Sequence, residues 1–271
     1  MPRAEGNASW LDRLNFYRDT AALPPVGEEP DLSRAVREHA RYMVNHDTVE
    51  HAQRARRWST PDGARAAAVS NLAGSTNAFE PDVWAVDTWM QAPFHALGIL
   101  DPALRQVGFG IHRAQNGRIQ TAAGLDVIRG RHPAQAATVR YPIVWPADGA
   151  SVPLTTHTHE YPSPLASCDG YTAPVGLPLI VQLGAGTRVP RVIASFVGDE
   201  QPLEHCVFDE GTYRNRRAVE ERLGRSILAS RDAIVVIPRQ PLRHGAEYRV
   251  VLEVAGQPRI DWRFSISPGA R

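Results

Sequence analysis

The pattern of hydrophobic and polar positions divides the chain near residue 135. Before that point, apolar residues recur every three or four positions, which is the period of an amphipathic helix. The clearest case is a predicted helix over residues 31–45, whose apolar face consists of Leu32, Ala35, Val36, His39, Ala40 and Met43. Asp31 or Ser33 is expected to cap its start.

Two more helices and a hairpin are predicted in the first half. One helix runs from Trp10 to Ala22 and stops before two prolines, because proline cannot continue a helix. The other runs from about Pro81 to Met90, and Pro93 is expected to close it. Residues 106–113 and 118–128 follow as two strands joined by a turn at 115–117.

The second half has a different pattern, in which short alternating runs are separated by Pro and Gly. Such a pattern is typical of a β-sandwich. The candidate strands are residues 141–145, 177–183, 190–197, 233–237, 246–254 and 259–266. Residues 214–230 are rich in Arg and are expected to form either a short helix or a long loop.

Composition and charge narrow the classes of function. The 271 residues, 43% of them hydrophobic, suggest one or two domains with a substantial core. All 30 basic residues are Arg, and the net charge of +1 gives no electrostatic reason to expect nucleic acid or an anionic membrane as a partner. No apolar stretch reaches the ~20 residues that a membrane span needs.

Two features concern the cellular compartment. No apolar signal-peptide segment follows Met1, so a secreted protein with this sequence would be the mature form. The only cysteines are Cys168 and Cys206. They fit either one disulfide in an oxidising compartment or two buried thiols.

Several motifs in the first half occur in the order and spacing of one known family. Residues 14–26 read LNFYRDTAALPPV, residues 31–43 read DLSRAVREHARYM, and residues 83–110 read VWAVDTWMQAPFHALGILDPALRQVGFG. Together they resemble the bacterial CAP superfamily (SCP, or cysteine-rich secretory protein, antigen 5 and pathogenesis-related 1) over roughly residues 9–128. The resemblance implies an α-β-α sandwich with a central cleft lined by two histidines, which correspond to His51 and His95.

The second half resembles bacterial Ig-like modules, including those that follow CAP domains. The residues that carry this resemblance lie at 237–242, 245–250 and 261–264. We therefore expect an α+β chain with a CAP/SCP-like domain at residues 1–132, a linker at 133–140 and an Ig-like β-sandwich at 141–271. The resemblance also favours a Cys168–Cys206 disulfide and an extracellular or cell-surface location.

The resemblance places His51, His95, Ser70 and Asn71 in the cleft. Two imidazoles can hold a divalent metal, so His51 and His95 are the candidate metal ligands and Zn²⁺ is the candidate cofactor. However, Ser70 stands where the family has the Glu of its GENIA-like motif, and Ala92 stands at a second Glu position. A hydroxyl is a poor base and cannot offset the charge of a dication. We therefore expect a cleft whose histidines are held by hydrogen bonds, with weak metal binding at most.

Other candidate residues have weaker signals. Asp87 lies on the same predicted helix as Trp89 and is a possible acidic substitute. Ser70 is a conceivable nucleophile beside one of the two histidines. His39 is expected to be a core histidine with satisfied hydrogen bonds. For His157, His159 and Glu160, a solvated strand or loop is favoured over a metal site.

The expected function is that of a binding or interaction module without catalysis. The expected ligand is a small molecule, a lipid or a component of the cell envelope. Two alternatives stay open: a metal-dependent, peptidase-like hydrolase that uses the two cleft histidines, and a carrier of lipids or small apolar ligands.

Overall fold

The computed structural model describes residues 9–269 except 55, 137, 185–190 and 200. The N-terminal residues that bear on a signal segment therefore lie mostly outside the described part, as does the first residue of the strand predicted at 190–197. The chain forms two compact units. The first contains Met1–Asp19, Pro24–Met90 and Gly98–Val139, and the second contains Thr20–Leu23, Gln91–Leu97 and Arg140–Arg271.

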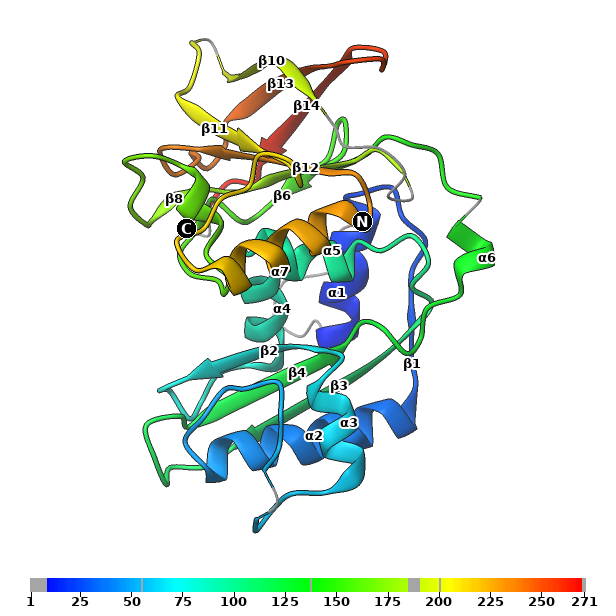
Figure 1. The fold of residues 1–271 in the computed structure, drawn as a ribbon, viewed down its shortest axis with the longest axis vertical. Coiled ribbons are helices and arrows are strands. Elements are labelled where there is room, and N and C mark those ends of the chain that lie inside the picture. The colour runs from blue at the N-terminus through cyan, green and yellow to red at the C-terminus, as the bar shows by residue number, and fades with distance from the viewer. Residues whose placement is uncertain (1–8, 55, 137, 185–190, 200, 270–271) are drawn as a thin grey trace. The chain divides into compact units, whose positions relative to one another are not determined.

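The first unit has a central sheet with helices on both faces (Figure 1). Its strands are ordered β1 (Gly27–Glu28), β3 (Gln106–Arg113), β4 (Thr121–Asp126) and β2 (Ser70–Ser75). β1 pairs with β3 in parallel, and the other pairs are antiparallel. The helices are α2 (Pro30–Asn45) and α3 (Pro61–Ala67) on one face, and α1 (Trp10–Asp19) and α4 (Asp82–Met90) on the other.

The helix ends differ in part from the predictions. Glu29 caps α2 by accepting a hydrogen bond from the Asp31 N–H, so the expected cap at Asp31 or Ser33 is wrong. The reason is that Pro30 occupies the first helical position, where its missing N–H costs nothing, which moves the start one residue earlier. For the same reason Pro93 begins a further helix, α5 (Pro93–Ile99), rather than only closing α4.

Two glycines in β3 let α2 approach the sheet closely. A Cβ at Gly110 would overlap backbone atoms of Arg37, and a Cβ at Gly108 would overlap the backbone of Leu32. A Cβ at Gly124 of β4 would meet the Val36 side chain of α2 instead. Glycine therefore sets the distance between helix and sheet, because any side chain at these two β3 positions would push α2 away.

The second unit contains two four-stranded sheets and one two-stranded sheet among its described residues. The first has the order β10-β13-β14-β6, the second β11-β12-β9-β5, and the small one pairs β7 with β8. Their bounds are β5 Ile143–Trp145, β6 Ser151–Val152, β7 Thr156–His157, β8 Val175–Gly176, β9 Leu179–Gln182, β10 Val192–Gly198, β11 His205–Phe208, β12 Ala233–Pro238, β13 Glu247–Val254 and β14 Ile260–Ile266. The six predicted strands are all present, whereas the four short ones (β6, β7, β8 and β11) are additional to the prediction.

Burial shows which face of each sheet is covered. Burial alternates along β14: Ile260, Trp262 and Phe264 are buried, and the residues between them are exposed. This pattern is typical of a sheet with one solvent-exposed face. In contrast, every residue of β12 is buried. The Ser195 hydroxyl of β10 and Nε2 of His205 in β11 lie 2.9 Å apart, which links the two four-stranded sheets.

The second unit is not purely β. Residues Ala218–Ala229 form helix α7, which contacts β12, so the helix alternative for the Arg-rich segment is the one observed. Two shorter helical segments are α6 (Pro133–Ala136), in the expected linker, and the 3-10 turn η1 (Pro164–Ser167). Cys168 follows η1 and forms a disulfide with Cys206 of β11, which confirms the predicted bond. Among the described residues, no helix is long and apolar enough to cross a membrane.

Candidate functional site

His95 lies at the start of α5 and is held by a buried carboxylate. Glu160 Oε1 lies 2.6 Å from Nδ1 of His95 and accepts a second hydrogen bond from the His95 backbone N–H at 2.8 Å. Glu160 Oε2 accepts a third from the Phe94 N–H at 3.2 Å. The Glu160 side chain is fully buried, and that of His95 is 18% exposed. Because a carboxylate only accepts hydrogen bonds, Nδ1 of His95 carries a proton, and in the neutral ring the lone pair is on Nε2.

The residues just before α5 are held by β7. The imidazole of His157 donates from Nδ1 to the carbonyl oxygen of Gln91 at 2.8 Å, and the Thr156 hydroxyl bonds to the Gln91 side chain at 3.2 Å. His157 is 1% exposed, and burial lowers its pKa. The neutral imidazole of His157 therefore works as a structural donor that fixes the backbone from which α5 begins.

An aromatic cluster anchors the residue next to His95. The ring of Phe94 packs edge-on against Tyr213 at 5.3 Å and lies 6.3 Å from Phe208. The Tyr213 hydroxyl donates to the carbonyl oxygen of Ser163, and its ring lies directly against Gly224 of α7, where a Cβ would clash with it. Aromatic packing of this kind and the bonds to Glu160 together give His95 one orientation.

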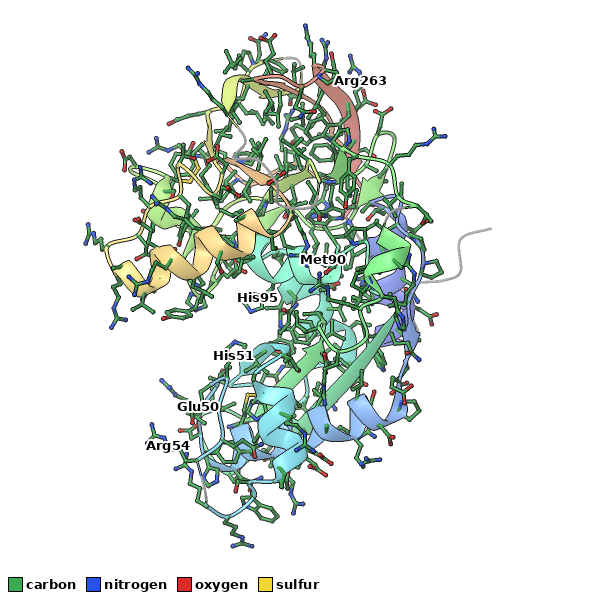
Figure 2. The ribbon with its side chains drawn as sticks, turned by 45° about the vertical axis from the view of Figure 1, so that its right-hand side comes forward. Glu50, His51, Arg54, Met90, His95 and Arg263 are labelled. Atoms are coloured by element: carbon green, nitrogen blue, oxygen red, sulfur yellow. A yellow bond between two sulfur atoms is a disulfide. The ribbon has the colours of Figure 1, made fainter. Side chains whose placement is uncertain are left out.

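His51 lies in the first unit, on the segment that follows α2. Figure 2 labels it near Glu50, and its Nδ1 lies 2.9 Å from the carbonyl oxygen of Ala67 at the end of α3. Because a carbonyl oxygen accepts, Nδ1 of His51 also carries a proton. His51 and His95 thus belong to different units, and each has its ring fixed at Nδ1 by an oxygen acceptor.

Ser70 and Asn71, the other expected cleft residues, are buried in β2 at 5% and 8% exposure. The Ser70 hydroxyl is buried without a hydrogen-bond partner among the described residues, so no histidine activates it as a nucleophile there. The Asn71 side-chain oxygen lies close to the position that a Cβ of Gly98 would occupy.

Asp87, the possible acidic substitute, has other partners. Its carboxylate accepts a hydrogen bond of 2.7 Å from the Tyr17 hydroxyl and forms an ion pair with Arg13 at 2.9 Å. Burial raises the pKa of Asp87, and burial and the Asp87 charge together raise the pKa of Tyr17. These contacts join α1 to α4, which indicates a bracing role for Asp87.

His39 confirms the expectation of a satisfied core histidine. It is fully buried, its Nδ1 accepts from the Gln53 amide at 3.1 Å, and its Nε2 donates to the carbonyl oxygen of Glu50 at 3.0 Å. Burial lowers its pKa to about 4. Arg18 has a similar bracing role, since its buried guanidinium donates to the carbonyl oxygens of Pro24, Ile99 and Asp101.

The expectation of a solvated strand or loop at residues 157–160 is wrong for two of its residues. His157 and Glu160 are buried, whereas His159 is exposed. The reason is that β7 ends at His157, so the alternation that would place His157 and His159 on one side does not continue. Throughout the described residues, no group of three or more His, Cys, Asp or Glu side chains is arranged to hold a metal ion.

The sequence singled out Glu160 only as part of a disfavoured metal site with His157 and His159, and it did not reveal Glu160 as the partner of His95. Glu160 lies 65 residues from His95, beyond the hairpin of the first unit, and its contacts with Phe94 and His95 come only from the fold. The one signal in the sequence is a Glu within a short run of His and Thr followed by Tyr and Pro, and that run is not specific.

Comparison with known proteins agrees with the arrangement of the first unit. No curated protein matches the chain. A protein-family model does: residues 11–123 match CAP, the cysteine-rich secretory protein family. The matched stretch is less than half of the chain and includes His51, Ser70, Asn71 and His95. The match supports a CAP domain over residues 11–123.

Proposed function

We propose that this chain is an extracellular or cell-surface protein whose CAP domain works as a binding module through His51 and His95. Residues 141–271 are proposed to form an Ig-like domain, in line with their two four-stranded sheets. The family match supports the CAP domain, and the Cys168–Cys206 disulfide fits an oxidising compartment. The proposed ligand is a small molecule, a lipid or a cell-envelope component.

The observation that carries the proposal is the bond between Glu160 and His95. It fixes both the orientation and the tautomer of the ring. A fixed side chain loses little conformational freedom on binding, so its hydrogen bond to a ligand is offset less by entropy. Such pre-organisation is useful to a binding site and needs no chemical step.

The zinc expected from the family does not fit the described residues. Structural zinc sites use four protein ligands and catalytic sites three, and no such group is present among the described side chains. Ser70 supplies no carboxylate, and Glu160 is committed to His95 and to two backbone N–H groups. We therefore favour the binding module over the metal-dependent hydrolase.

Co-sedimentation with an insoluble cell-envelope preparation tests the binding module. We expect wild-type protein to appear in the pellet, and the variants His51→Ala and His95→Ala to stay largely in the supernatant. The matched control is His132→Ala, at an exposed histidine for which no role is proposed. Equal sedimentation of all four proteins would show that the two histidines are not used.

Two further measurements decide between the binding module and its alternatives. Calorimetric titration with ZnCl₂ is expected to give no heat that depends on His51 or His95; such heat, together with peptidase activity, would support the hydrolase instead. Mass spectrometry of the solvent extract of purified protein tests the carrier. A stoichiometric lipid that is lost in His95→Ala would identify the ligand class, and a lipid retained equally in all variants would speak against these histidines.

A further inference from the structure

A group of exposed arginines in the first unit lies on α2 and the segment after it. Arg41, Arg54, Arg56 and Arg57 are all exposed. Two of them, Arg41 and Arg57, lie over the ring of Trp58, and we call these five residues the Arg–Trp patch. Figure 2 labels Arg54 on this segment. Among the described residues, only one of these four arginines forms an ion pair: Arg56 lies 3.9 Å from the carboxylate of Glu50.

The indole of Trp58 orders two of these guanidinium groups. The Cζ atom of Arg41 lies 3.6 Å from the centre of the Trp58 ring, and that of Arg57 lies 4.6 Å from it. Both distances are within the range of cation–π attraction. Two positive charges are thus held against one ring, and a bound anion would reduce the repulsion between them.

The backbone at the patch is also held in place. Trp58 has a φ of +72°, in the left-handed region that a bulky residue rarely adopts. The carbonyl oxygen of Arg57 accepts a hydrogen bond from Nε2 of His46. The Tyr42 hydroxyl accepts from both the Arg54 N–H and Nε of Arg56, each at 3.0 Å. Tyr42 of α2 and the neighbouring His46 therefore hold the backbone at Arg54 and Arg57 and the guanidinium of Arg56.

The electrostatic effect of the patch reaches a neighbouring residue. The pKa of His112 in β3 is lowered, first by burial and then by the positive charge of Arg41. The charge of Arg41 is therefore felt by other groups in spite of the near-zero net charge of the whole chain.

We propose that the Arg–Trp patch binds a polyanion that carries phosphate groups. Guanidinium is planar and donates two parallel hydrogen bonds to phosphate oxygens, and it stacks on aromatic rings while doing so. The two guanidiniums held on Trp58, with Arg54 and Arg56 exposed on the same segment as Arg57, offer a polymer with several phosphates more contacts than a single phosphate ion could make. This site belongs to the first unit alone and goes beyond the function proposed for His51 and His95.

Binding of linear inorganic polyphosphate, followed by calorimetry at low salt, tests the proposal. We expect wild-type protein to bind and the double variant Arg41→Gln/Arg57→Gln to bind at least tenfold more weakly. The matched control is Arg34→Gln/Arg65→Gln, which removes the same charge from two exposed, ion-paired arginines of the same unit. This control is expected to bind within twofold of the wild type.

The variant Trp58→Leu separates the effect of aligning the guanidinium groups from the effect of their charge. It leaves the net charge unchanged but removes the ring that aligns Arg41 and Arg57, so we expect binding to weaken severalfold. Thermal unfolding of each variant checks that the fold is intact, and Arg41→Lys keeps the charge without the planar fork if Trp58→Leu does not fold.

Four results would overturn the proposal. They are no binding of polyphosphate, equal loss in the two double variants, orthophosphate binding as tightly as the polymer, and single-stranded DNA binding more tightly than polyphosphate. None of them affects the interaction between His95 and Glu160, so failure here is distinct from failure of the proposed function.

Discussion

Glu160 Oε1 accepts hydrogen bonds from both the backbone N–H and the ring Nδ1 of His95. One oxygen atom thus fixes the first turn of α5 and the orientation of its histidine. The family match includes His95 but ends well before Glu160. An acidic partner that the first half lacks, with Ser70 and Ala92 at the expected positions, is supplied by a later segment.

Replacing Glu160 should destabilise the protein in proportion to the acceptors lost. Glu160→Leu leaves two buried N–H groups and the imidazole without their acceptor, and we expect the free energy of unfolding to fall by about 3 kcal/mol. Glu160→Gln keeps one acceptor oxygen and should cost about half as much. Urea unfolding measures both, with the exposed Glu247→Gln as control.

A spectroscopic test isolates the effect of Glu160 on the ring itself. Long-range nitrogen–proton NMR of His95 in the neutral form should show the Nδ1–H tautomer in wild-type protein. Glu160→Leu should populate the Nε2–H tautomer. An unchanged spectrum in a folded Glu160→Leu protein would mean that the carboxylate does not set the tautomer.

His39 should make stability depend on pH in a defined window. Burial lowers its pKa to about 4 in the folded protein, below the ordinary value of 6.5. Between these values the unfolded chain binds a proton that the folded protein does not, so stability falls as the pH is lowered from 6.5 towards 4. The full loss is about 3 kcal/mol, and none of it is felt above the unfolded pKa.

The variant His39→Gln identifies this contribution. Urea unfolding at pH 8 and pH 5 should show a smaller loss of stability on acidification in His39→Gln than in the wild type. His157, whose pKa burial also lowers, adds a loss of the same sign to both proteins and cancels in the comparison. Equal losses in the two proteins would contradict the assignment.

Gly110→Ala should be strongly destabilising. Its Cβ would overlap backbone atoms of Arg37, and a backbone can yield only if α2 shifts as a whole. We expect a loss of about 3 kcal/mol, at the upper end of the cost of overpacking. Gly27→Ala is the matched control, because a Cβ there meets nothing within 4 Å. Similar melting temperatures for the two variants would show that α2 adjusts freely.

Loss of the disulfide should also lower stability. Cys168 and Cys206 are separated by 38 positions, and a cross-link that closes a loop of this size is expected to stabilise a protein by about 4 kcal/mol. The double variant Cys168→Ser/Cys206→Ser should therefore unfold at lower urea concentration. In the native wild type, thiol reagents should react only after reduction, whereas rapid labelling without reductant would contradict the bond.

The predictability of the fold follows from how each element is buried. Helix α2 and strands β13 and β14 have one covered face, so their periodicity is visible in the sequence. Strand β2 escapes prediction because its first four residues are all buried and none is β-branched or aromatic. Helix α5 escapes prediction because a proline that ends one helix can equally begin the next, and Pro93 does so.

The candidate site was only partly predictable for a related reason. His51 and His95 lie within motifs that are local in sequence. Glu160 and His157 act through contacts that form only when β7 pairs with β8 and meets the segment at Gln91. No periodicity or spacing in one sequence encodes a contact of that range.

The assignment of Gln91–Leu97 to the same unit as Arg140–Arg271 has a consequence for inheritance and engineering. The stretch that matches CAP cannot be transferred to another protein with the surroundings of His95 intact, because residues of the downstream half provide those surroundings. A chimera that joins this first half to an unrelated partner would carry the histidine without its acceptor. The two halves should therefore diverge together, and recombination between them would be tolerated only where the new partner brings its own counterpart of Glu160.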